Sequence, residues 1–119
     1  MIWLIGCNGM LGTEVASKLS ERKIDFVGTG HEVDITEISA LAEFAKGKNI
    51  DLIINYAGYT AVDKAETEPD LTKKINEIGT ENIARLANQI HATLIHISTD
   101  YVFAGITVKP CCAENVVFY

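Results

Sequence analysis

The chain has 119 residues, the length of one small domain. Its content of 48% hydrophobic and 22% charged residues is ordinary for a globular protein and excludes an intrinsically disordered chain. The formal net charge of −6 argues against a nucleic-acid partner or an anionic membrane surface, because such partners require clustered Lys and Arg.

Apolar strands alternate with amphipathic helices along the chain. Strands are predicted over residues 1–5, 24–27, 51–55 and 93–97. Helices are predicted over 10–22, from the N-cap Thr36 to Gly47, and over 66–90, with Pro69 in the first turn and Gly79 at a point of close packing. This alternation, without a hairpin signal, predicts an α/β protein: a Rossmann-like, doubly wound parallel sheet, incomplete, with about four strands and three helices.

A glycine-rich loop follows the first strand and opens the first helix. Gly6, Gly9 and Gly12 have the G-x-x-G-x-x-G spacing that allows a tight turn, close approach to a pyrophosphate and close packing of the helix. The position between a strand and a helix favours a dinucleotide site, and a glycine-rich turn without a ligand is the alternative.

The second strand leaves the choice between NAD and NADP open. An NAD site places an acidic residue at the end of this strand to bind the ribose 2′-hydroxyl. That acid is absent here unless Glu32 reaches back, and no arginine is present for a 2′-phosphate.

The segments after the third and fourth strands carry the other candidate residues. Ala57 and Gly58 are small enough to let a dinucleotide lie across the sheet edge. The nearby Asp63, Lys64 and Glu66 form either a local charge network or a solvated helix start. Thr99 follows the fourth strand, where a hydroxyl can polarise a substrate carbonyl; a strand-terminal cap is the alternative.

Neither a metal site nor a membrane segment is predicted. Cys7, Cys111 and Cys112 have neither metal-ligand spacing nor a disulfide framework, and the vicinal pair is either two reduced thiols or a strained redox element. The apolar N-terminal segment is too short for a secretory signal, and no apolar run approaches about 18 residues. We therefore expect a soluble, cytoplasmic protein.

Four sequence blocks resemble the dTDP-4-dehydrorhamnose reductases of the extended short-chain dehydrogenase/reductase family: residues 6–12, 33–36, 55–69 and 96–105. The resemblance implies reduction of the C4 ketone of a dTDP-linked deoxysugar with NADPH or NADH, giving dTDP-L-rhamnose for cell-surface polysaccharides. By this resemblance, Gly9, Met10 and Leu11 would line the pyrophosphate, and Asp34 and Ile35 would flank the adenine. Gly58, Tyr59 and Thr60 would follow the cofactor past the third strand, and Ile97 would touch its nicotinamide half. Thr99 and Asp100 would face the sugar.

The family's catalytic triad is a threonine, a tyrosine and a lysine four residues after the tyrosine. Thr99 matches the first member, whereas Tyr119 comes about four residues early and no lysine follows it. We therefore expect residues 1–119 to form a dinucleotide-binding domain without the C-terminal substrate domain and without turnover alone.

Three hypotheses remain: a truncated reductase, a non-catalytic NAD(P)-binding regulatory module, and an enzyme completed by another chain. An incomplete sheet also predicts self-association through the exposed edge near Leu94, Ile95 and Ile97.

Overall fold

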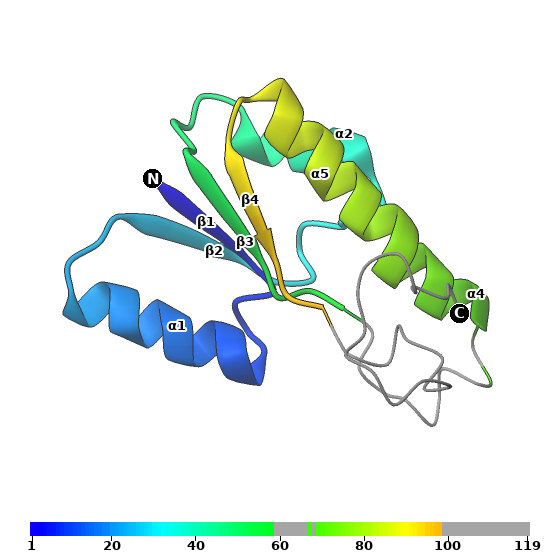
Figure 1. The fold of residues 1–119 in the computed structure, drawn as a ribbon, viewed down its shortest axis with the longest axis horizontal. Helices are drawn as coiled ribbons and strands as arrows, with labels where there is room; N and C mark the ends of the chain where they lie inside the picture. The colour runs from blue at the N-terminus through cyan, green and yellow to red at the C-terminus, as the bar shows by residue number, and fades with distance from the viewer. Residues whose placement is uncertain (59–66, 68, 99–119) are drawn as a thin grey trace, which may run out of the picture.

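The computed structural model describes residues 1–58, 67 and 69–98. Four parallel strands form one sheet in the order β2-β1-β3-β4 (Figure 1). The strands are β1 (Ile2–Ile5), β2 (Phe26–Thr29), β3 (Leu52–Asn55) and β4 (Thr93–His96). The predicted α/β parallel sheet is confirmed.

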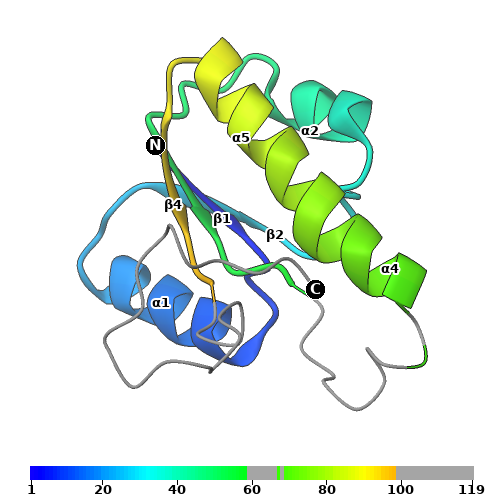
Figure 2. The same ribbon diagram turned by 45° about the vertical axis from the view of Figure 1, so that its right-hand side comes forward.

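Helices cover both faces of the sheet, as a doubly wound topology requires. Helix α1 (Met10–Glu21) lies on one face, while α2 (Ile38–Ala45) and the continuous stretch of α4, η1 and α5 lie on the other (Figures 1 and 2). That stretch consists of α4 (Pro69–Lys73), the π-helix η1 (Lys74–Gly79) and α5 (Thr80–Gln89). The predicted third helix therefore contains a π-helical turn, and Pro69 is its first residue.

The main core lies between the sheet and the face formed by α2 and α5. Trp3 and Ile53 are fully buried there against Leu41, Ile83 and Leu86. The indole Nε1–H of Trp3 donates to Thr29 Oγ1 at 2.9 Å, so its one polar group is satisfied inside the core. This hydrogen bond links the side chains of β1 and β2, which are paired in parallel.

The opposite face is less covered at β4. Leu94 packs on the main core, so the alternation of a strand turns Ile95 and Ile97 toward the α1 side. Their side chains are 45% and 46% exposed. Of the three residues predicted at an exposed edge, Ile95 and Ile97 are therefore exposed, at or next to β4, the last strand in the sheet order of the described residues, whereas Leu94 is half-buried against the core.

Two predicted element boundaries were wrong. The second strand begins at Phe26 because residues 22–24 continue the end of α1: Ile24 N–H donates to Leu19 O at 3.0 Å, and Lys23 has a φ of 55°. The N-cap of α2 is Glu37 instead of Thr36, because the Thr36 N–H and hydroxyl both donate to Asp34 Oδ1, at 2.8 and 2.7 Å.

Candidate functional site

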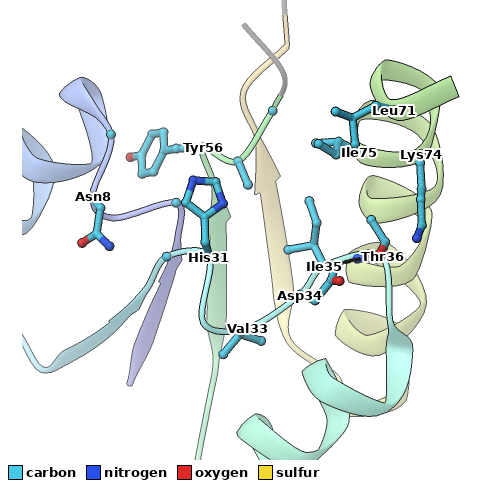
Figure 3. A pocket seen from close by; sticks show the side chains of 15 residues that line it. Asn8, His31, Val33, Asp34, Ile35, Thr36, Tyr56, Leu71, Lys74 and Ile75 are labelled. Atoms are coloured by element: carbon cyan, nitrogen blue, oxygen red, sulfur yellow. Dashed lines mark hydrogen bonds between the residues drawn. The ribbon is translucent and has the colours of Figure 1, made fainter. Parts of the chain in front are cut away.

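A pocket of about 490 Å³ lies across the carboxyl ends of β1, β2 and β3 (Figure 3). Strands β1 and β3 are neighbours, and the helices that follow them lie on opposite faces of the sheet. This is the topological switch point at which open α/β sheets bind ligands. The lining residues are Gly6, Asn8, Gly9, Gly30, His31, Val33, Asp34, Ile35, Thr36, Tyr56, Ala57, Gly58, Leu71, Lys74 and Ile75.

The glycine loop after β1 forms one wall of the pocket. Gly6 has a φ of +80°, and a Cβ there would lie 2.7 Å from Ala57 N, so both its conformation and its surroundings require glycine. A Cβ on Gly12 would overlap Gly6 O and lie 2.8 Å from Cys7 Cα. Because both glycines lack a Cβ, α1 begins against the loop with its N-cap, Gly9, lining the pocket.

The end of β2 carries an acidic group that the sequence left undecided. Glu32 turns back, and its Oε1 accepts a hydrogen bond from Gly30 N–H at 2.7 Å. Hydrogen bonds from the backbone of Gly30 and of Glu32 itself lower the pKa of this carboxyl below its usual value. An ionised carboxylate is therefore held at the tip of β2, beside Gly30, which lines the pocket.

The next wall is built by residues 34–36. The two hydrogen bonds from Thr36 are the main cause of a lowered pKa of Asp34, and the charge of Lys74 contributes. Asn82 Nδ2 donates to Ile35 O at 3.1 Å, which ties this segment to α5. The Ile35 side chain is buried and lies so close to Gly79 that a Cβ there would be 2.6 Å from Ile35 Cδ1. The predicted close packing at Gly79 is confirmed.

The floor of the pocket follows β3. Asn55 is fully buried, and its Oδ1 accepts from Ala57 N–H at 2.9 Å. Its Nδ2 lies 3.0 Å from His96 Nδ1, so the neutral ring nitrogen accepts from the amide. Desolvation lowers the pKa of His96, which favours this neutral form. Asn55 thereby holds the turn that carries Tyr56, whose pKa is raised by burial.

The helix opposite the glycine loop completes the pocket with residues that the sequence did not single out. Leu71, Lys74 and Ile75 point into it from the α4–η1 stretch, and Lys74 approaches Asp34 and Thr36 (Figure 3). Their spacing of three and four residues shows one helix face. The pattern alone could not show that this face meets the sheet edge. Asn8, His31, Val33, Thr36 and Tyr56 were missed as well, although each lies in or next to a loop that follows a strand.

The predicted site residues divide into three groups. Six line the pocket: Gly6, Gly9, Asp34, Ile35, Ala57 and Gly58. Met10, Leu11, Gly12 and Ile97 are described but do not line it, and Met10 is 95% exposed. Tyr59, Thr60, Asp63, Lys64, Glu66, Thr99, Asp100 and Tyr119 lie outside the described residues. The cofactor and catalytic roles of all these residues stay predictions.

Neither a metal cluster nor a membrane span is found in the described part of the chain. Residues 1–58, 67 and 69–98 contain no group of three or more His, Cys, Asp or Glu side chains able to hold a metal ion. Within the same residues, no helix has the length and apolar character needed to cross a membrane. Cys7 is a free thiol whose pKa is raised by desolvation and by the charge of Glu32.

Comparison with known proteins agrees with this geometry. The family model of the RmlD substrate binding domain matches residues 1–115. The chain belongs to this family. A dTDP-4-dehydrorhamnose reductase of Mycolicibacterium smegmatis is 39% identical over 106 residues, which are 88% of this chain and 32% of the relative.

Two solved structures of the RmlD family extend the comparison. The dTDP-4-dehydrorhamnose reductase of Bacillus anthracis, in complex with NADP, is 37% identical with a TM-score of 0.83, covering 90% of this chain and 39% of its own. The Clostridium acetobutylicum reductase is 40% identical with a TM-score of 0.85, covering 92% and 40%. The chain thus spans about a third of the length of the curated relatives it matches.

Proposed function

We propose that this chain is the dinucleotide-binding part of a dTDP-4-dehydrorhamnose reductase, an oxidoreductase that uses NADPH or NADH to reduce the C4 ketone of dTDP-4-dehydro-L-rhamnose. The single observation that carries the proposal is the pocket at the switch point, bordered by a glycine loop that tolerates no side chain at Gly6 or Gly12. The reaction is proposed from the sequence similarity to dTDP-4-dehydrorhamnose reductases.

The pocket suits the adenosine half of a dinucleotide. Its volume of about 490 Å³ falls within the usual range for a small-molecule site. Ile35, Ile75 and Leu71 offer an apolar surface for a planar base, with the polar Asp34 and Thr36 beside it. Gly9, at the N-terminus of α1, leaves the backbone amides of the first turn open to a pyrophosphate.

The chemical step is assigned to residues that lie outside the described part of the chain. By the family resemblance, Thr99 and Tyr119 would be catalytic, and Thr99 with Asp100 would contact the sugar. Because the chain spans about a third of the length of its relatives, we propose that its 119 residues form a single dinucleotide-binding domain. This domain would bind cofactor with negligible turnover by itself.

Calorimetric titration with NADPH and NADH tests the proposal, with Gly9→Asp as the decisive variant. Gly9 is an N-cap without a side-chain hydrogen bond, and Asp is a preferred N-cap, so the variant should fold at least as well as the parent. Its carboxylate would repel the pyrophosphate, and we expect a loss of cofactor affinity of at least about tenfold. Ser17→Asp, on the exposed surface of α1, adds the same charge and should bind like the parent. Absence of binding to the parent protein at millimolar cofactor contradicts the proposal.

We further propose a cytoplasmic protein that self-associates through the β4 edge. The support is the exposure of Ile95 and Ile97 at the last strand of the sheet. Light scattering should show a species larger than the monomer, and a monodisperse monomer contradicts this part of the proposal.

A further inference from the structure

We propose that His96 and Asn55 couple the dinucleotide pocket to pH: the pocket binds its cofactor while the His96 ring is neutral, and protonation of that ring weakens binding. The inference rests on the proposed function, because it concerns the regulation of the same pocket. His96 is a positioning residue, since it does not line the pocket and acts on the floor through its contact with Asn55.

The orientation of the Asn55 side chain is fixed by a backbone group. Ala57 N–H can only donate, so the atom 2.9 Å from it is the acceptor Oδ1 of Asn55. The amide nitrogen Nδ2 therefore faces His96 Nδ1, at 3.0 Å, and an amide nitrogen can only donate. It follows that Nδ1 is the unprotonated nitrogen of a neutral ring, whose proton is on Nε2.

A proton on His96 Nδ1 turns this acceptor into a second donor. If the Asn55 amide keeps its orientation, Nδ2 loses this acceptor. If the amide turns to offer Oδ1 to the ring, Nδ2 faces Ala57 N–H, and that hydrogen bond is lost instead. Asn55 is fully buried, so either rearrangement leaves a buried polar group without its present partner, which is unfavourable. His96 itself is exposed, so solvent protons reach the ring without opening the core.

The Ala57 N–H connects this pair to the pocket. Ala57 lines the floor together with Tyr56 and Gly58 (Figure 3). Ala57 N lies 2.7 Å, and Tyr56 C 3.0 Å, from the point that a Cβ on Gly6 would occupy, so this turn packs directly on the glycine loop. Loss of the hydrogen bond to Asn55 therefore frees the floor to shift against the loop that would hold the pyrophosphate.

The charged groups on the neighbouring elements form no ion pair with His96 in residues 1–58, 67 and 69–98. Strands β3 and β4 carry no titratable side chain besides His96 itself, and the turn after β3 carries Tyr56. The helical stretch that ends in α5, which packs on β4, carries Asp70, Lys73, Lys74, Glu77, Glu81 and Arg85. The charged residues of 59–66, 68 and 99–119 lie outside the described residues. Burial lowers the pKa of His96, which favours the neutral ring that Asn55 requires.

The test measures the dissociation constant of NADH by calorimetric titration between about pH 8 and 5.5, a range that includes the usual pKa of histidine. His31 lines the pocket and would itself titrate there, so every protein compared carries His31→Asn. In this background the affinity for NADH should fall at least about fivefold as the pH decreases. Tryptophan emission, measured at each pH, separates loss of binding from loss of the fold.

Two added substitutions identify the histidine responsible. His96→Asn should abolish the decrease in affinity, because asparagine offers Asn55 an acceptor oxygen at every pH. His91→Asn is the matched control. It removes an exposed histidine outside the pocket lining, at a φ of 58° that asparagine tolerates, and it should leave the decrease unchanged.

A nuclear magnetic resonance titration of the histidine rings gives a second readout on the parent chain, with His96→Asn used only to assign the signal. Coupling between two sites is reciprocal, so saturating NADH should lower the pKa of His96. The negative charge of the cofactor, acting directly on the ring, would raise this pKa instead. An unchanged or raised pKa of His96 in the complex therefore overturns the inference.

The outcomes separate the two proposals. If the affinity for NADH does not change with pH in the His31→Asn background, or if the decrease persists in His96→Asn, the role of His96 is refuted while the dinucleotide site stands. If His91→Asn abolishes the decrease as well, the effect is not specific to His96 and the inference also fails. If the parent chain does not bind NADH at about pH 8, the proposed function fails and this inference with it.

Discussion

The contact between Gly79 and Ile35 connects the helix after β3 to the pocket wall, and Gly79→Ala probes it. An added Cβ would lie 2.6 Å from Ile35 Cδ1 and 2.7 Å from Ile35 Cγ1, both too close for carbon atoms. Overpacking of this kind costs about 1–3 kcal/mol. Replacing a helical glycine by alanine returns about 1 kcal/mol. We therefore expect Gly79→Ala to lower the free energy of unfolding by about 1 kcal/mol.

A double-mutant cycle with Ile35→Ala separates the two effects. Alanine at position 35 removes Cγ1 and Cδ1 and leaves Cβ 3.5 Å from the added methyl, an ordinary contact. In that background Gly79→Ala should stabilise the protein by about 1 kcal/mol, so the coupling energy is about 2 kcal/mol. Ile35→Ala alone should cost about 2–5 kcal/mol, because the side chain is buried.

Urea denaturation followed by tryptophan fluorescence measures each corner of this cycle. The chain has one tryptophan, Trp3, which is fully buried and hydrogen-bonded in the main core, so its emission reports the loss of that core. A second readout is cofactor binding, which Gly79→Ala should weaken because Ile35 is pushed toward the pocket that it lines. The reasoning is refuted if Gly79→Ala stabilises the protein equally in both backgrounds.

Two further predictions concern the floor and the glycine loop. Desolvation lowers the pKa of His96 in the folded chain, so below about pH 6.5 the unfolded chain binds a proton at His96 more readily than the folded chain. The free energy of unfolding should therefore decrease as the pH falls below this value. In His96→Asn this contribution to the pH dependence of stability should vanish. An equal slope in both proteins between pH 7 and 5 would contradict the role of His96. Gly12→Ala should cost at least about 2 kcal/mol, because its Cβ overlaps backbone, whereas Gly9→Ala, whose Cβ lies 3.4 Å from Gly6 O, should cost less than half as much in the same denaturation experiment.

The fold was largely predictable from local patterns. The apolar run 51–55 predicts a buried parallel strand, and β3 occupies it with Ile53 and Asn55 fully buried. The glycine spacing predicts a tight strand-to-helix turn, and the absence of room at Gly6 and Gly12 confirms it. Such features depend on neighbours in sequence, so periodicity and turn chemistry suffice to identify them.

Element boundaries and capping were less predictable because alternatives of similar energy compete locally. Thr36 is a good N-cap residue by type, yet its hydroxyl donates to Asp34, two residues earlier. The strand predicted from Ile24 begins two residues later because the end of α1 takes up residues 22–24.

By itself, the sequence determined the order of strands and helices, the glycine loop and the class of ligand such a loop suits. Only the tertiary structure decided that Glu32 turns back to Gly30, and that Leu71, Lys74 and Ile75 face the carboxyl ends of the strands. The placement of the three helix residues depends on contacts between distant segments, such as Gly79 against Ile35 and Asn82 on the carbonyl of Ile35. The contact of Glu32 with Gly30 is a local hydrogen bond, which apolar periodicity does not predict. Periodicity shows which residues share a helix face, whereas packing across the sheet sets what that face meets.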